Sequence, residues 1–437
     1  MTMKRFAEQA VFWLVGVAMA LATALVGDSL VFPFRGRVAA AIVGVALLLA
    51  ILRRKRLSST VLVVLAAGAI WQWGSPALDR HSVWGDLADA RVAGRHFVVG
   101  YTDVAEVRDL SRAGLIGGVF LTRRNVQGRG AADVAAEIQG LQADRRNSGL
   151  PPLIVAGDQE GGVVTHLSPP LPPVPALSLL AALAPEERRT VALREGEAAG
   201  RALASLGVTM DLAPVVDLKP TSGRSVFDVH TRIATRAISD DPDAVSEIGS
   251  AFSAGLLGAG VTPTAKHFPG LGSVATDTHL FGATVDKPRA SLDASEWRPF
   301  RAMLSVPGTA VMLSHVSVEA VDPGVPASRS RRVVDGMLRR EWGFDGIAIT
   351  DDLTMGAVVH SGLCRAVEDG LNAGVDLLLV SWDTDRIYPA LRCAADAARG
   401  DRLDAATLAA SARRLDGARF DPASGLAHEQ GSGISTP

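Results

Sequence analysis

The stretch Gly346-Ile347-Ala348-Ile349-Thr350-Asp351-Asp352 decides the fold prediction, together with the helical pattern 333–341 that precedes it. A short, continuously apolar run of this kind is typical of a strand buried on both faces of a parallel sheet. Similar runs occur at 96–101, 117–121, 153–157, 208–212, 261–266, 309–314 and 375–380, with helical patterns such as 131–147, 186–206, 241–257 and 388–398 between them. Eight strand–helix units favour an α/β fold of the (β/α)8 TIM type over an open doubly wound sheet.

Polar side chains stand where most of these runs end. A (β/α)8 barrel carries its functional residues at the carboxyl ends of its strands, so this placement supports the barrel and indicates one site at its mouth. The residues so placed are Asp158, Glu160, Asp211, Asp217, Lys266, His267, His315, Asp351 and Asp352.

The first 75 residues differ in composition from the rest of the 437-residue chain. They carry eight Lys/Arg and two acids, a net charge of +6, which leaves −8 for the remainder of a chain whose total is −2. The mean hydropathy is +0.23, and 48% of the residues are apolar. This composition excludes a disordered chain, a disulfide-built mini-protein and a basic nucleic-acid binder.

Three apolar runs, 10–27, 38–52 and 58–74, predict a membrane anchor over residues 1–75, because a spanning helix needs about 20 mostly apolar residues. The positive clusters at Lys4-Arg5 and 53–56 would stay cytoplasmic, which places everything after Gly74 outside. We therefore expect a cell-membrane protein with an extracytoplasmic catalytic domain. Two alternatives are a cleaved signal peptide at the first run and two spans with the body in the cytoplasm.

The remainder is expected to form one barrel over 76–420 and a disordered tail over 421–437. Cys364 and Cys393 lie in successive helical stretches without metal-ligand spacing. Buried free thiols are the favoured interpretation of this pair, and a disulfide is the alternative.

Two motifs carry chemistry that suits a barrel mouth. After Lys266-His267-Phe268-Pro269-Gly270-Leu271-Gly272 comes Asp277-Thr278-His279, in which the carboxylate can orient the imidazole for proton transfer near neutral pH. In Thr350-Asp351-Asp352-Leu353-Thr354-Met355 the two acids cannot point the same way. One is expected to face the mouth as nucleophile or base, and the other to hold a neighbouring loop.

A third motif, Asp158-Gln159-Glu160-Gly161-Gly162, suits the binding of sugar hydroxyls. With these motifs in this order, the chain resembles a bacterial β-N-acetylhexosaminidase of glycoside hydrolase family 3, of the peptidoglycan-recycling type. That family has Asp-x-Glu-Gly-Gly, Lys-His-Phe-Pro-Gly-x-Gly with Asp-Ser/Thr-His downstream, and Ser-Asp-Asp-Leu-x-Met. The resemblance covers about residues 95–385.

The resemblance implies a retaining hydrolase that removes terminal β-linked GlcNAc from peptidoglycan fragments. Asp351 would be the nucleophile, and His279, paired with Asp277, the acid/base that stands in for the usual second carboxylate. The implied substrate-binding residues are Asp158, Arg236, Lys266, His267, His166 and Met355. The implied chemistry needs no cofactor and no metal, and the expected partners are the carbohydrate and the membrane, not nucleic acid.

Two departures from the family pattern bear on the substrate. Val163 and His166 stand where the family has arginines after Glu-Gly-Gly, and neither reproduces a guanidinium fork; Leu271 stands where it has a second histidine. A β-glucosidase-type glycosidase and a catalytically impaired, membrane-anchored sugar sensor are therefore kept as alternatives. A barrel metallohydrolase is disfavoured, because the His-x-His pair expected after the first strand is missing.

Overall fold

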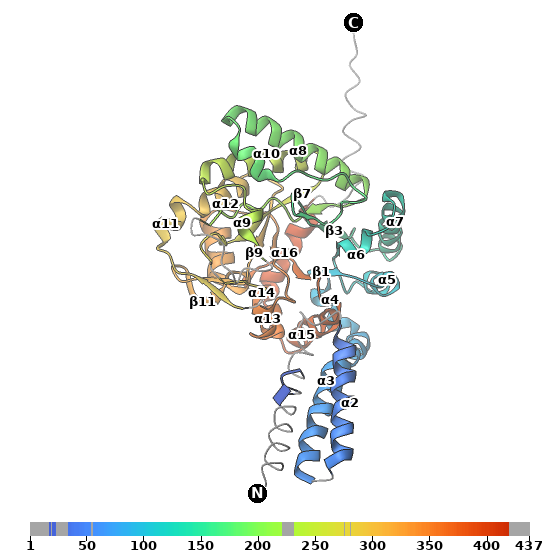
Figure 1. Cartoon of the computed structure of the whole chain (residues 1–437). Helices are drawn as coiled ribbons and strands as arrows, with labels where there is room; N and C mark the ends of the chain where they lie inside the picture. Colours follow the sequence, from blue (N-terminus) through green and yellow to red (C-terminus); the bar gives the residue numbers. More distant parts are fainter. Residues whose placement is uncertain are drawn as a thin grey trace.

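Eight parallel strands form the centre of the molecule (Figure 1). The computed structural model describes residues 17–18, 20–22, 34–53, 56–220, 231–274, 276–279 and 281–418. The strands follow one another around the sheet in chain order, each parallel to the next. They are β1 (Phe97–Gly100), β2 (Gly118–Leu121), β3 (Ile154–Gly157), β6 (Met210–Asp211), β7 (Thr262–Phe268), β9 (Ala310–Leu313), β12 (Ala348–Thr350) and β13 (Leu378–Val380).

The sheet curls into a nearly closed barrel. Its two outer strands, β12 and β13, meet through a parallel bridge between Ile349 and Leu377. The backbone N–H of Thr350 donates to the carbonyl oxygen of Leu377 at 2.9 Å. Each of the eight apolar runs overlaps one of these strands, so the α/β barrel prediction agrees with the structure.

The strands are mostly apolar because they are covered on both faces. Alternate side chains of a strand point to opposite faces of its sheet. Val98, Phe120 and Ile154 belong to one buried cluster inside the barrel. Their strand neighbours, such as Val99 and Val119, belong to a second and larger cluster that includes residues of the surrounding helices.

The long predicted helices are present, with ends that differ by one residue or not at all. For example, α10 begins after Asp241, whose side chain accepts from the backbone N–H of Asp243, with Pro242 at the first helical position. The helices around the barrel are α5 (Val104–Arg112), α7 (Ala131–Asn147), α8 (Pro185–Ser205), α10 (Pro242–Gly258), α12 (Trp297–Leu304), the π-helical η4 (Arg332–Glu341), α14 (Leu363–Ala373), α15 (Ile387–Arg399) and α16 (Ala405–Gly417).

Shorter elements complete the loops. The hairpin of β4 (Gln159–Gly161) and β5 (Val164–Thr165) follows β3, and a three-stranded sheet lies beside the barrel. That sheet contains β8 (Ala283–Val285), β10 (Val316–Val318) and β11 (Asp322–Pro326). The short helices are α4 (Leu87–Gly94), η2 (Leu177–Ala182), α6 (Arg123–Val126), α9 (Ile233–Arg236), α11 (Arg289–Ala294), η3 (Ala327–Arg329), α13 (Gly356–Val359) and η5 (Thr384–Arg386).

The N-terminal helices α2 (Arg35–Arg53) and α3 (Arg56–Gly85) form a hairpin that extends from the barrel (Figure 1). Within the described ranges, no helix has both the length and the apolar character needed to span a bilayer, so the predicted N-terminal transmembrane region is wrong. Arg35 begins α2 as a buried ion-pair partner of Asp383, and α3 continues past residue 75 through Asp79 and Arg80. Most of the first apolar run, 10–27, lies outside the described residues, as does the predicted tail 421–437.

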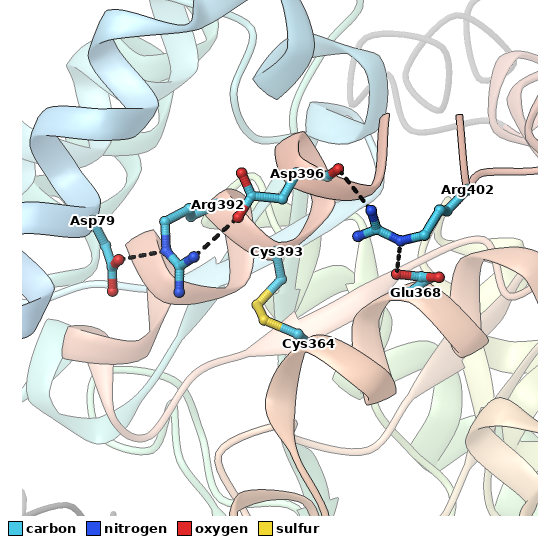
Figure 2. The surroundings of a disulfide bond; sticks show 7 residues. All are labelled: Asp79, Cys364, Glu368, Arg392, Cys393, Asp396 and Arg402. Carbon is cyan, nitrogen blue, oxygen red and sulfur yellow. Dashed lines mark hydrogen bonds and ion pairs between the residues drawn. A yellow bond between two sulfur atoms is a disulfide. The ribbon is translucent and has the colours of Figure 1, made fainter. Parts of the chain in front are cut away.

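The prediction of free thiols is also wrong, because Cys364 and Cys393 form a disulfide (Figure 2). It joins the beginning of α14 to α15, whose Cα atoms at these positions lie 4.8 Å apart, within disulfide range. Close by, Arg392 of α15 pairs with Asp79 of α3 at 2.5 Å, so the N-terminal hairpin packs on the same helix (Figure 2). The sequence shows no sign that these two helices place their cysteines face to face.

Candidate active site

The carboxyl ends of the strands surround a pocket of about 680 Å³. Eight of the nine predicted site residues line it: Asp158, His166, Arg236, Lys266, His267, His279, Asp351 and Met355. The ninth, Asp277, is buried behind His279. A larger cavity of about 910 Å³ lies at the opposite end of the barrel, but it is lined by none of these residues, and functional sites of such barrels lie at the carboxyl face.

Lys266, near the carboxyl end of β7, is the centre of a charged cluster in the pocket floor. Its Nζ lies 2.6 Å from Asp158 Oδ1 and 2.6 Å from Glu160 Oε1. Arg236 of α9 forms a bidentate ion pair with Glu160. Its Nε donates to Oε2 at 2.9 Å, and an amino nitrogen donates to Oε1 at 2.6 Å. The sequence identified Glu160 only as part of a motif. In the structure, its carboxylate holds Lys266 and Arg236 in place.

The cluster stays charged. Burial by itself would lower the pKa of Lys266, but the carboxylates of Asp158 and Glu160 outweigh burial and raise it. Burial by itself would raise the pKa of Glu160, but Arg236 and Lys266 outweigh it and hold that pKa far below its usual value. The floor therefore offers fixed donors and acceptors at neutral pH, which is what the recognition of sugar hydroxyls requires.

His267 is oriented by Asp217, a strand-end acid outside the predicted site set. Its Nδ1 lies 2.6 Å from Asp217 Oδ2, and Asp217 Oδ1 accepts from the backbone N–H of Leu271 at 2.7 Å. An amino nitrogen of Arg236 lies 3.2 Å from the other ring nitrogen, Nε2. The network assigns the proton to Nδ1, so Nε2 is an acceptor for the guanidinium. Asp217 thus fixes both the ring and the Pro-Gly loop.

His279 is held by Asp277, as the Asp-x-His spacing predicts. Its Nδ1 lies 3.1 Å from Asp277 Oδ1, and the same oxygen accepts from the backbone N–H of His279 at 2.9 Å. Thr231 also donates to Asp277 Oδ1, at 3.0 Å. Asp277 is 1% exposed, while the His279 side chain is 38% exposed and lines the pocket. Thr231 carried no signal in the sequence.

The two adjacent acids after β12 have different surroundings. Asp351 lines the pocket, and its Oδ1 accepts from the backbone N–H of Asp352 at 2.8 Å. Asp352 is turned to the loop after β13, where its carboxylate accepts from the backbone N–H of Ser381 and Trp382 and from the Ser381 hydroxyl at 2.6 Å. It also accepts from the backbone N–H of Thr354. One acid faces the mouth and the other ties two loops together, as the pattern predicts.

Asp351 is ionised at neutral pH. Burial by itself would raise its pKa, but the electrostatic influence of His267, His315 and His279, together with the hydrogen bond from the Asp352 backbone N–H, outweighs burial and holds the pKa below its usual value. His315 is buried beneath this region, where its Nδ1 lies 2.8 Å from the Ser328 hydroxyl, and burial lowers its pKa. An ionised carboxylate beside an oriented imidazole can support nucleophilic and acid–base chemistry.

Two of the three departures from the family motifs, His166 and Leu271, line the same pocket. Val163, in the turn between β4 and β5, is 52% exposed. His166 Nδ1 lies 3.7 Å from Asp158 Oδ2, and buried Leu271 lines the wall.

The lining residues that escaped the sequence prediction include Arg123, Arg124 and Trp382. Arg123 and Arg124 follow β2 and Trp382 follows β13, so the strand-end rule could have found them.

Comparison with known proteins places this site in a family. The model of the glycosyl hydrolase family 3 N-terminal domain matches residues 88–417. A β-hexosaminidase of Xanthomonas oryzae pv. oryzae is 33% identical over 309 residues, which cover 70% of this chain and 86% of that protein. One of Xylella fastidiosa is 35% identical over 287 residues, 65% of this chain and 81% of that protein.

Solved structures agree with the sequence relatives. A family 3 β-N-acetylglucosaminidase from a Paenibacillus species matches with a TM-score of 0.68 and 31% identity over 80% of this chain and 64% of its own. A β-N-acetylhexosaminidase from Beutenbergia cavernae matches with a TM-score of 0.67 and 30% identity over 77% of this chain and 99% of its own. The chain therefore belongs to glycoside hydrolase family 3, alongside bacterial β-hexosaminidases, and it is a glycosidase.

Proposed function

We propose that the protein is a retaining β-N-acetylhexosaminidase that removes terminal β-linked GlcNAc. The observation that carries the proposal is the pairing of an ionised Asp351 with an Asp277-held His279 in one pocket, above a floor of buried, fixed charges. The names of the relatives, β-hexosaminidase and β-N-acetylglucosaminidase, support the choice of substrate sugar.

In the first step, a carboxylate oxygen of Asp351 attacks the anomeric carbon as the bond to the leaving oxygen breaks. His279 gives its proton to that oxygen, so the aglycone departs as an alcohol and the sugar remains esterified to Asp351. In the second step, His279 takes a proton from water, and the resulting hydroxide displaces Asp351. Each displacement inverts the anomeric carbon, so the two together retain its configuration. The buried Asp277 carboxylate stabilises the imidazolium form between protonations.

The charged floor binds the sugar that is cleaved off. Asp158 accepts hydrogen bonds from sugar hydroxyls, whereas Lys266 and Arg236 donate hydrogen bonds to hydroxyl oxygens. Glu160 holds both cations in place. The side chains need no rearrangement to do this, because each is already held by a neighbour. Preorganised polar groups of this kind strengthen their contacts when the substrate excludes water.

Two finer points belong to the same proposal. The natural substrates are GlcNAc-terminated peptidoglycan fragments, as the likeness of the motifs to the peptidoglycan-recycling branch suggests. The catalytic domain folds in an oxidising, extracytoplasmic compartment, since disulfides persist mainly where thiols are not kept reduced.

The test uses the full chain with p-nitrophenyl β-GlcNAc and p-nitrophenyl β-glucoside. We expect hydrolysis of the first, with kcat/KM reduced at least about 10³-fold in Asp351→Asn and about 10²-fold in His279→Ala, the range of covalent and acid–base contributions. Asp345→Asn and His81→Ala, which remove the same groups at exposed positions outside the pocket, are the controls.

The anomeric configuration of the first-formed sugar, read by NMR, tests the stereochemistry. β-GlcNAc supports the two-step mechanism, and α-GlcNAc overturns it. Activity in Asp351→Asn within tenfold of the parent protein would remove Asp351 from its role as nucleophile. Binding of GlcNAc without turnover by the parent protein would favour the sugar-sensor alternative. A preference for the glucoside would favour the β-glucosidase alternative.

A further inference from the structure

Two adjacent arginines are held over the pocket by a rigid turn. Thr122 caps α6: its hydroxyl accepts from the backbone N–H of Arg124 at 3.2 Å, and its own N–H donates to Asn125 Oδ1 at 2.8 Å. The Asn125 amide donates in turn to the carbonyl oxygen of Tyr101 at 3.0 Å. This pinned turn directs Arg123 and Arg124 to the pocket, where both side chains are exposed lining residues.

Trp382, in the loop after β13, extends this surface next to Arg124. The guanidinium carbon of Arg124 lies 4.4 Å from the centre of the Trp382 ring, within cation–π range. The same side chain donates to the carbonyl oxygen of Trp382 at 3.5 Å. The backbone N–H of Trp382 is held by Asp352, yet the residue remains 47% exposed and lines the pocket. An aromatic ring held in this way can pack on the apolar face of a sugar.

Arg123 reaches the hairpin where the family pattern is broken. Its amino nitrogen donates to the carbonyl oxygen of Thr165 at 3.3 Å, one residue before His166. In the part of the chain that the structure describes, no carboxylate pairs with this guanidinium. Arg123 therefore brings a cation from a different loop to the hairpin that carries Val163 and His166.

We propose that Arg123, Arg124 and Trp382 form an aglycone subsite that binds leaving groups bearing a carboxylate, such as a lactyl ether or a uronic acid. The inference rests on the proposed function: the terminal GlcNAc occupies the charged floor, so the exposed rim faces what is attached to it. Guanidinium groups favour planar carboxylates through paired hydrogen bonds. The tryptophan ring supports the sugar that carries the carboxylate.

The test measures binding by calorimetry to the full chain carrying Asp351→Asn. Three disaccharides are compared: GlcNAc-β-1,4-MurNAc, GlcNAc-β-1,4-glucuronic acid and the neutral GlcNAc-β-1,4-GlcNAc. We expect at least one acidic disaccharide to bind tenfold or more tightly than the neutral one, and the better acidic ligand to identify the source of the carboxylate. Adding Arg123→Gln and Arg124→Gln reduces the preference to less than twofold.

Matched variants separate charge from packing. Arg146→Gln, which removes one exposed charge of α7, leaves the preference unchanged. Trp382→Leu weakens acidic and neutral ligands alike, because it removes the sugar platform. Arg123→Gln alone, checked for folding by its melting temperature, is the second variant and lowers the preference at least threefold.

Equal affinity for acidic and neutral disaccharides, or a preference that survives the double arginine variant, overturns the subsite. Hydrolysis of p-nitrophenyl β-GlcNAc by the unmodified protein distinguishes the two levels of inference. Turnover without the preference refutes the subsite alone. The absence of both turnover and disaccharide binding refutes the proposed function and the subsite with it.

Discussion

The disulfide between Cys364 and Cys393 gives the sharpest test of how the last helices are stabilised. Cys364→Ala removes the cross-link at an exposed position and leaves the buried Cys393 in place. The bond joins residues 29 apart in the sequence. For a loop of about 30 residues, chain entropy gives about 12 cal/mol/K, or about 3.6 kcal/mol of stability at 25 °C.

This free energy converts into a shift of melting temperature. The family domain covers residues 88–417. At about 2.1 cal/mol/K per residue, roughly 330 residues unfold with an entropy of about 0.7 kcal/mol/K, so loss of the cross-link lowers Tm by about 5 °C. Scanning calorimetry of the parent protein and the variant, with and without reductant, measures the shift.

The reductant provides the internal control. It should lower the Tm of the parent protein by the same amount and leave Cys364→Ala unchanged. Cys393→Ala should lose somewhat more than Cys364→Ala, because it also removes a buried sulfur. The reasoning is refuted if reduction and Cys364→Ala both leave Tm within 1 °C, or if the native protein contains two titratable thiols.

Three further predictions concern buried charges. Burial raises the pKa of Asp211 to about 8, and its Oδ2 has no hydrogen-bond partner among the described residues. Between pH 5 and 7 the folded state therefore binds one proton more than the unfolded state, so the stability of the parent protein falls as pH rises. The stability of Asp211→Asn should gain on the parent by roughly 1.4 kcal/mol per pH unit, levelling off above about pH 8. If urea unfolding gives the same difference between variant and parent at every pH, the prediction is refuted. Arg35→Met should lower the free energy of unfolding, measured with urea, by about 3–5 kcal/mol, because the completely buried Asp383 loses its principal cation. Arg37→Met, at an exposed position, is the control and should lower it by less than about 0.5 kcal/mol. Equal effects of the two substitutions would contradict this prediction. Asp352→Ala should lower the free energy of unfolding by at least about 3 kcal/mol and also lower kcat/KM, because it leaves several hydrogen-bond donors of two loops without a partner. An unchanged Tm would contradict this role of Asp352.

The fold was predictable because its signal is local. Continuous apolar runs mark strands covered on both faces, and all eight runs overlap barrel strands. The strand-end rule then places Asp158, Lys266, His267 and Asp351 at one mouth, and the structure brings them to one pocket. The Asp-x-His spacing likewise foretold a contact, since both residues lie in the same short segment.

The N-terminal prediction failed for a reason that is also local. Hydropathy counts apolar residues but does not say what covers them. In the structure, α2 and α3 bury Ala39, Ile42, Ala46 and Ala69 in one cluster between them, and Arg35 is buried in an ion pair with the barrel. In the sequence, an apolar run looks the same whether lipid covers it or a neighbouring helix does.

The sequence by itself determined the number and order of the barrel strands, the positions of the acids and bases at their ends, and the Asp277–His279 pair. Only the tertiary structure decided which groups from distant segments meet. Cys364 with Cys393, Asp217 with His267, and Arg124 with Trp382 are contacts of this kind. The physical reason is that apolar periodicity and turn chemistry act over a few residues, whereas these contacts depend on how whole helices and loops pack around the closed sheet.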